Sequence, residues 1–172
     1  LMPLLASKAC LAAIAAILTD IASANFSPEM HPVFLATRAI GIRKPNGKLR
    51  PICIGCVFQR LAAQRVVRSI RPQLSAVMGP QQFGYGVKGG VEAAAHIANH
   101  ALNGPVPLML TKIDITNAFP TRDRQHIGRS ILHEPSLAPM HRIFWFTYHE
   151  PTDMRLLDSQ GKTTEVVQSS NG

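Results

Sequence analysis

Asp114 is the residue whose type and position are best suited to chemistry. It lies in the stretch KIDITNAFPTRDR (residues 112–124), at the end of an apolar run that starts near Val106, and Phe119 follows five residues later. Alternate residues from Leu108 to Asp114 share one face of an expected strand. A carboxylate at a strand end is a ligand type that Mg²⁺ prefers. A structural carboxylate at a strand end, followed by a turn, explains the same residue.

A long stretch without acidic residues is the second feature. The chain has no Asp or Glu between Glu29 and Glu92, its net charge is +8 and its pI is about 10. The basic residues of this interval are Arg38, Arg43, Lys44, Lys48, Arg50, Arg60, Arg65, Arg68, Arg71 and Lys88. Because apolar residues are interleaved with these charges, the stretch should fold rather than form a solvated tail. Its positive field should attract a polyanion such as nucleic acid, although a solvated helix face also explains part of it.

Two cysteine and histidine pairs have the residue types of a zinc site. Cys53 and Cys56 form C-x-x-C, and His96 and His100 form H-x-x-x-H. The 39 residues between Cys56 and His96 exceed finger spacing, and Cys53 lies in a β-like run. Glu92, His96 and His100 share a helix face by i, i+4 spacing. A polar helix face explains them without metal, so we expect no zinc here.

The first residues resemble a secretory signal, because Lys8 precedes an apolar run over 9–18 and Ala22-Ser23-Ala24 resembles a cleavage site. The run is too short to span a membrane. Seven residues precede the lysine and the first is not Met, which favours an amphipathic helix of a globular domain. Three cysteines form no even disulfide set. We therefore expect an intracellular protein of the nucleus or cytoplasm, neither secreted nor bound to a membrane.

The elements that position these residues follow from periodicity and turn signals. A chain of 172 residues is long enough for one domain with a real core. Expected helices cover residues 5–22, 57–71, 91–102, 122–133 and 137–149. Expected strands cover residues 33–43, 48–54, 106–114, 153–158 and 163–168. Pro45-Asn46-Gly47 and Gln160-Gly161-Lys162 predict two hairpin turns. This order favours an α+β fold with an antiparallel sheet over a doubly wound fold.

The loop expected over residues 80–90, PQQFGYGVKGG, has a composition suited to nucleic acid. It contains two aromatic residues, four glycines and one lysine. Glycines permit close approach of a backbone, and aromatic rings stack on bases. An ordinary turn accounts for the same composition.

Four segments of the chain resemble, in order, reverse transcriptases of non-LTR (LINE-type) retrotransposons. KPNGKLRPICIG is similar to their fingers motif, and QQFGYGVKGGVEAAAHI looks like the segment before the palm. KIDITNAFPTRDR looks like the first palm motif, and LLDSQGKTTEVVQSSNG resembles the hairpin that leads into the next one. The matches run from about residue 38 to the end of the sequence. Group II intron and retron enzymes share some of these motifs, but QFGYGVKGG favours the retrotransposon branch.

The resemblance implies an architecture and an activity. The fold would be the fingers and partial palm of a right-hand polymerase, with helices packed against antiparallel hairpins and a palm strand. Residues 1–105 would form the N-terminal helix and fingers region, and residues 106–172 a partial palm. The activity would be that of an RNA-directed DNA polymerase, which transfers nucleotides from dNTPs to a primer 3′-hydroxyl. An RNA template and a DNA primer would be its partners.

The resemblance also implies roles for individual residues. Asp114 would be the catalytic carboxylate, and with the backbone carbonyl of Ile115 it would bind Mg²⁺, of which a complete polymerase uses two ions. Arg50, with Lys44 beside it, would contact the incoming triphosphate. Phe119 would lie under the sugar and exclude a 2′-hydroxyl, unless it is a core aromatic residue. The implied template contacts are Gln82, Tyr85 and Lys88.

The sequence lacks the family's other metal-binding motifs. The family's other two carboxylates lie in an Ala-Asp-Asp hairpin, after a Gly-x-x-Gln-Gly-Asp-Pro segment, and neither occurs in these 172 residues. Asp123 begins an expected helix and is no substitute. We therefore expect a fragment that does not polymerise alone. The alternative is a non-catalytic basic RNA- or DNA-binding module in which Asp114 is merely structural.

Overall fold

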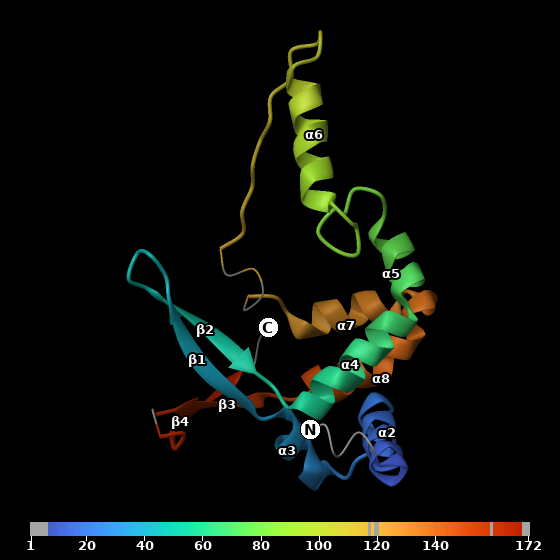
Figure 1. Cartoon of the computed structure of the whole chain (residues 1–172), viewed down its shortest axis with the longest axis vertical. Helices are drawn as coiled ribbons and strands as arrows, with labels where there is room; N and C mark the ends of the chain where they lie inside the picture. Colours follow the sequence, from blue (N-terminus) through green and yellow to red (C-terminus); the bar gives the residue numbers. More distant parts are fainter. Residues whose placement is uncertain (1–6, 117, 119–120, 159, 170–172) are drawn as a thin grey trace.

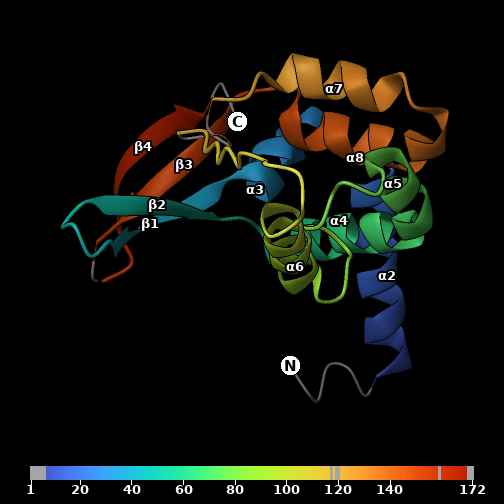
Figure 2. The same ribbon diagram turned by 90° about the horizontal axis from the view of Figure 1, so that it is seen from above.

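The structure is a computed structural model that describes residues 7–116, 118, 121–158 and 160–169 of the chain. Its sheet is built from two β-hairpins (Figures 1 and 2). Strands β1 (Thr37–Arg43) and β2 (Leu49–Ile54) form the first hairpin, and β3 (Thr152–Leu157) and β4 (Thr163–Ser169) form the second. Both hairpins confirm the sequence prediction, because local turn chemistry determines where each chain reverses.

The first hairpin turn shows how local that chemistry is. The Lys44 N–H donates to the Lys48 carbonyl oxygen at 2.8 Å, and the Gly47 N–H donates to the Lys44 carbonyl oxygen at 3.0 Å. Gly47 has a φ of 78°, which only glycine adopts without strain. The Asn46 side-chain oxygen accepts a hydrogen bond from the Lys48 N–H at 3.2 Å. The Pro-Asn-Gly sequence thus places two lysines at the hairpin tip.

The direction of one strand pairing differs from the prediction. The strand order is β2-β1-β3-β4, and β1 runs parallel to β3, so the sheet is mixed rather than antiparallel. Thr37 pairs with Met154, and Ala39 with Leu156. A period-two pattern indicates a strand but carries no information on the direction of its neighbour. Here the neighbouring hairpins are joined through a long helical segment rather than a tight turn, which permits the parallel pairing.

Three helices and a short helical turn form the core. Helices α2 (Lys8–Ala22), α4 (Val57–Ser69) and α8 (Ala138–Tyr148) pack together, with α3 (His31–Leu35) beside them. The buried core cluster consists of Ile21, Leu35, Ala62, Ile143 and Phe146. These three long helices confirm the sequence prediction within a few residues. None of the helices in the described ranges is long and apolar enough to cross a bilayer.

Proline accounts for the helical segments that the sequence pattern did not predict. The strand predicted from residue 33 begins only at Thr37, because a 3₁₀ turn (Pro28–Met30) and α3 occupy the preceding residues. After α4 the chain passes Ile70 and starts a new helix, α5 (Arg71–Met78), with Pro72 near its beginning. Proline lacks an N–H donor, so it fits the first turn of a helix and interrupts a longer one.

Helix α7 (Arg124–Leu132) precedes a 3₁₀ turn (Pro135–Leu137) and α8. The Asp123 carboxylate accepts a hydrogen bond from the Gln125 N–H at 2.8 Å and caps α7. This helix confirms the prediction over residues 122–133, because an Asp before an amphipathic run is a start signal.

The expected palm strand over residues 106–114 is the main correction. Helix α6 (Gly90–Leu102) projects from the rest of the structure, and the chain after it runs back toward the sheet and α7 (Figure 1). Residues 106–114 are assigned no strand and pair with no other strand in the described ranges. Met109 is 90% exposed and Ile113 is 83% exposed. The apolar pattern alone does not make a strand, because the backbone N–H and C=O groups need a neighbouring chain.

The division into residues 1–105 and 106–172 stays a prediction. The sheet takes β1 and β2 from the first region and β3 and β4 from the second. Contacts between the two regions are therefore part of the fold.

Candidate nucleic-acid interface

Three arginines share one face of the sheet. Arg38 in β1 lies opposite Arg155 in β3, and Arg50 in β2 lies opposite Ile42. Since Ile42 and Arg38 are four residues apart in one strand, their side chains emerge on the same side. Arg38, Arg50 and Arg155 are all exposed. We call this side of the sheet, defined by these three residues, the arginine face.

In the described part of the chain, no ion pair with an acidic residue is formed on the arginine face. The ion pair found in the described part of the chain joins His149 to Glu150, and no ion pair involves these arginines there. Asp153 lies two residues before Arg155 and shares its face by strand alternation, but it forms no ion pair with it. Guanidinium groups without carboxylate partners are available to phosphate oxygens, which they bind with two parallel hydrogen bonds.

Apolar side chains also lie on the arginine face. They are Ile40, Ile42 and Val166, each between 40% and 51% exposed. A face that combines positive charge with apolar surface fits the combination of phosphate, sugar and base in a nucleic acid.

The opposite face of the sheet points toward the helices. Cys53 and Met154 bring their sulfur atoms within 3.4 Å of each other there. Beside them lies a cavity of about 390 Å³, whose lining includes Thr37 of β1, Gln59 of α4 and Thr147 of α8. With one face toward the helical layer, the arginine face is the side of the sheet left for a ligand.

The two residues predicted to contact the triphosphate lie in the first hairpin. Lys44 is half-buried at the turn, and Arg50 is exposed on the arginine face. In the register of the first hairpin, Arg50 pairs with Ile42. The next pair toward the turn joins Leu49 to Arg43. Their predicted role in dNTP binding stays a prediction.

The three predicted template contacts lie in the loop between α5 and α6, as expected. The Gln82 side-chain oxygen accepts a hydrogen bond from the Gly84 N–H at 2.6 Å, so part of this amide is engaged within the loop. Tyr85 is half-buried and Lys88 is exposed. The Arg71 guanidinium donates to the Gly86 carbonyl oxygen at 3.4 Å and holds the loop against α5. Contact with a template stays a prediction for all three.

Asp114 and Ile115 are both exposed in the segment after α6. Within the described ranges, Asp114 has no hydrogen bond or ion pair, and it does not join another carboxylate, histidine or cysteine in a group close enough to hold a metal. These residues therefore do not fit a two-metal site by themselves. The predicted Phe119 lies outside the described residues.

The residues of the rejected zinc pattern lie on different elements. Cys53 is in β2 and Cys56 precedes α4, whereas His96 and His100 are exposed on the projecting α6 (Figure 1). The group of potential metal ligands in the described structure consists of other residues, His31, His149 and Glu150.

Sequence reasoning missed Arg155. The strand that contains Arg155 was predicted, so its exposed position on a strand could have been inferred from the sequence. Its position beside Arg38 could not, because that position depends on the parallel pairing of β1 with β3.

Comparison with known proteins gives one informative relative. Over 147 residues the chain is 31% identical to the "Retrotransposable element SLACS 132 kDa protein" of Trypanosoma brucei gambiense. The match covers 83% of this chain but only 12% of that protein. No family model matches the chain. No solved structure matches it either. The similarity shows that this chain is related to a retrotransposable-element protein.

Proposed function

We propose that this chain is the fingers and partial palm of an RNA-directed DNA polymerase from a LINE-type retrotransposon. The observation that carries the proposal is its 31% identity, over 147 residues, to a retrotransposable-element protein. Because that match covers 83% of the chain, it includes most of the stretch from residue 38 onward. This is the stretch in which four segments resemble reverse-transcriptase motifs in family order.

The arginine face supports a role in holding nucleic acid or nucleotide. Arg50 is the proposed contact to the triphosphate of an incoming dNTP, with Lys44 at the hairpin tip nearby in the chain. Arg38 and Arg155 would then bind phosphates of the template or primer. Arginine suits all three positions, because its planar group binds phosphate oxygens in a bidentate manner and stays charged at every physiological pH.

The proposal limits what the chain does alone. A two-metal polymerase site needs several carboxylates, and Asp114 is the one this chain supplies at the predicted position. We propose that the Mg²⁺ ions are held in the longer protein, where further carboxylates complete the set. This chain alone should then bind nucleic acid without extending a primer.

A second candidate is a non-catalytic module that binds RNA or DNA through its basic surface. The exposed arginine face and the isolated position of Asp114 favour it. In this case Asp114 would have no role in catalysis, even when the rest of a palm is supplied.

The experiment that separates the two candidates is a chimera. The chain is fused to the segment that follows the matching region in the related retrotransposable-element protein, and dNTP incorporation on an RNA template is measured with Mg²⁺. We expect activity in the chimera and a loss by orders of magnitude in Asp114→Asn, because a charged ligand is removed with little change in shape. Binding of primer and template should change little.

The matched control is Asp123→Asn, which makes the same chemical change nine residues away. Asn caps a helix about as well as Asp, so α7 should remain intact and activity unchanged. Equal activity in Asp114→Asn and the parent chimera would refute the metal-ligand role. A folded chimera that binds primer and template but never extends would favour the binding module.

A further inference from the structure

Three side chains from distant parts of the sequence meet where α3 lies near the end of α8. His31 begins α3, whereas His149 and Glu150 directly follow α8. Each offers one potential ligand atom, and these atoms all lie within 4.8 Å of one another. The Nε2 atom of His149 is 3.5 Å from the Oε1 atom of Glu150. Two imidazoles and a carboxylate are a common ligand set for divalent transition metals.

Aromatic neighbours hold both imidazole rings in place. The His149 ring stacks on Trp145, with ring centres 5.2 Å apart and an angle of 23° between the planes. The His31 ring packs edge-on against Phe146 at 4.7 Å, and Phe146 is fully buried. His31 and His149 also meet edge to face, with ring centres 5.3 Å apart. The His31 ring is therefore positioned by the core, whereas the His149 ring stacks on Trp145, which is 63% exposed.

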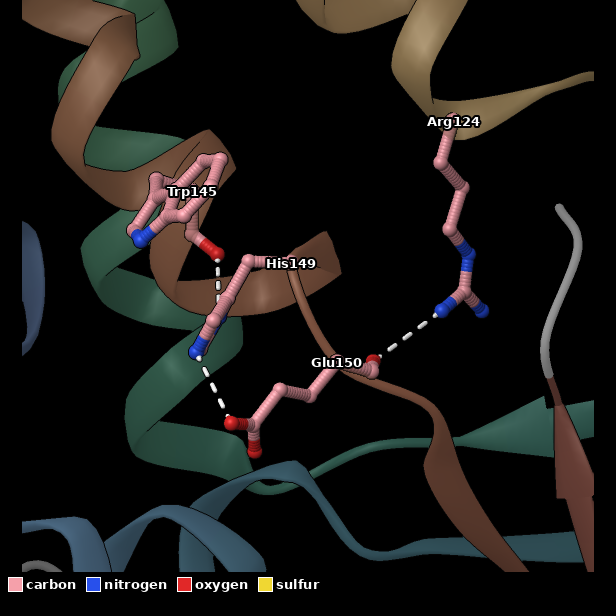
Figure 3. A network of polar contacts seen from close by, with 4 residues as sticks. All are labelled: Arg124, Trp145, His149 and Glu150. Carbon is pink, nitrogen blue, oxygen red and sulfur yellow. Dashed lines mark hydrogen bonds and ion pairs between the residues drawn. The ribbon is translucent and has the colours of Figure 1, made fainter.

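The two ring nitrogens of His149 each face an oxygen atom, Nδ1 a backbone carbonyl and Nε2 a carboxylate. Its Nδ1 atom is 2.8 Å from the carbonyl oxygen of Trp145 (Figure 3). Because a carbonyl oxygen only accepts, Nδ1 must carry the proton. In the neutral ring, Nε2 then presents a lone pair toward the Glu150 carboxylate, which also presents lone pairs. A metal cation between two such acceptors, 3.5 Å apart, would be attracted to both.

The distances agree with a metal ion between these groups. In a tetrahedral zinc site with bonds of about 2.1 Å, neighbouring ligand atoms are about 3.4 Å apart. The separation between His149 and Glu150 has this length. The three potential ligand atoms all lie within 4.8 Å of one another, and the exposed Glu150 side chain is the one that can adjust toward the two packed imidazoles.

Supporting contacts of the kind found around metal sites are also present. A carbonyl oxygen that accepts from the non-ligating nitrogen of a histidine fixes the ring in the orientation that a metal requires. The Arg124 guanidinium donates to the backbone carbonyl oxygen of Glu150 at 3.2 Å, which holds the chain at that residue (Figure 3). Its hydrogen bond is to the backbone, so the Glu150 carboxylate remains available.

We propose that His31, His149 and Glu150 bind Zn²⁺ or a chemically similar divalent transition metal, with a fourth coordination position open. This site is separate from Asp114 and does not depend on the polymerase proposal. Bound metal would join the start of α3 to the end of α8 and so clamp two distant parts of the chain. Its ligands differ from the Cys and His residues of the rejected zinc pattern.

Trp145 provides the measurement, because it is the only tryptophan in the sequence and stacks on a proposed ligand. The untagged chain is titrated with Ni²⁺ or Cu²⁺, which quench indole fluorescence at short range. We expect saturable quenching by one ion per chain, reversed by a chelator. Excess Zn²⁺ should displace Ni²⁺, whereas Cu²⁺, which binds such ligands more tightly than Zn²⁺, tests only saturation and stoichiometry. We also expect Zn²⁺ to raise the melting temperature of the parent chain.

Two variants remove one ligand each. Glu150→Gln changes an exposed side chain and should leave the fold intact, and His31→Gln tests the ligand from α3. We expect the dissociation constant to rise about tenfold or more in each, a change at least as large as the loss of a supporting residue around a metal site. The shift of melting temperature with Zn²⁺ should disappear in both.

The control is His100→Gln, which breaks the i, i+4 histidine pair on α6. That helix projects from the opposite end of the structure (Figure 1), so the quenching of Trp145 should be unchanged. Absence of saturable quenching, or equal quenching in Glu150→Gln and the parent, would overturn the proposal. The three residues would then be a packing contact of two histidines beside an exposed carboxylate.

Discussion

Arg38 and Arg155 are direct neighbours across the parallel pairing of β1 and β3. Their positive side chains emerge side by side from the same exposed face, and no ion pair in the described structure neutralises them. Like charges on adjacent strands destabilise a sheet. An anionic partner would relieve this repulsion, as the phosphates of the proposed nucleic-acid ligand would.

Arg155→Gln should have opposite effects on stability and binding. Removing one of two adjacent positive charges should raise the free energy of unfolding by roughly 0.2–1 kcal/mol at low salt. Affinity for a labelled RNA or DNA oligonucleotide should fall severalfold. Denaturant unfolding and fluorescence anisotropy measure the two effects. Arg129→Gln, an exposed arginine on α7, is the control for loss of charge elsewhere. Lower stability in Arg155→Gln would contradict the repulsion between Arg38 and Arg155.

Binding of oligonucleotides should depend steeply on salt. If phosphate contacts dominate, log affinity falls linearly with log salt, with a slope of about −0.7 to −0.9 per phosphate neutralised. Arg155→Gln should make that slope shallower by about the value for one phosphate contact. The measurement is a titration of the same oligonucleotide at several salt concentrations. Affinity that does not change with salt would remove the electrostatic basis of the interface.

Phe119→Val should change sugar selectivity in the chimera. The prediction rests on the resemblance, because Phe119 lies outside the described residues. A ring beneath the sugar rejects a 2′-oxygen by steric clash, and a smaller side chain opens the space. The ratio of kcat/KM for ribonucleotides to that for deoxyribonucleotides should therefore rise. If Phe119 is a core residue, both activities should fall together and the ratio should stay constant.

Phe146→Ala tests the core that holds the helices and His31. Phe146 is 0% exposed, so truncation should lower the free energy of unfolding by about 3–5 kcal/mol. Leu132→Ala is the control, because Leu132 is 62% exposed and its truncation should cost only about 0.5 kcal/mol. Chemical denaturation of both variants gives the comparison. If both variants lost a similarly small free energy of unfolding, Phe146 would not belong to the core.

Glu134 offers a test of local electrostatics at the turn after α7. The Ser136 hydroxyl donates to its carboxylate at 2.6 Å and the Ser136 N–H at 3.2 Å, which together lower the pKa of Glu134 below its ordinary value of 4.5. A lowered pKa in the folded state stabilises the fold above the ordinary value, and this stabilisation is lost as pH falls through the lowered value.

Ser136→Ala removes the hydroxyl and should move the pKa of Glu134 back toward 4.5. An NMR titration of the Glu134 side chain measures this shift directly. Thr164→Ala, on the exposed β4 strand, is a control that should leave the Glu134 titration unchanged. An identical Glu134 pKa in Ser136→Ala and the parent would show that the hydroxyl is not responsible.

Local signals determined much of the fold from the sequence alone. Pro45-Asn46-Gly47 predicted the first hairpin, and Asp123 before an amphipathic run predicted the start of α7. These predictions succeeded because the hydrogen bonds involved connect residues only a few positions apart. The acid-free basic stretch fixes the sign of the charge from residue types alone, and the anionic partner that it indicates stays a prediction.

The tertiary structure decided the features that depend on distant neighbours. The apolar pattern of residues 106–114 predicted a strand, but strand formation requires a partner whose presence no local pattern encodes. The meeting of His31 with His149 depends on how α3 packs beside α8. Arg155 joined Arg38 only through the parallel pairing of two hairpins. Sequence alone determined which residues carry charge and where the chain turns, whereas long-range packing determined which of those charges meet.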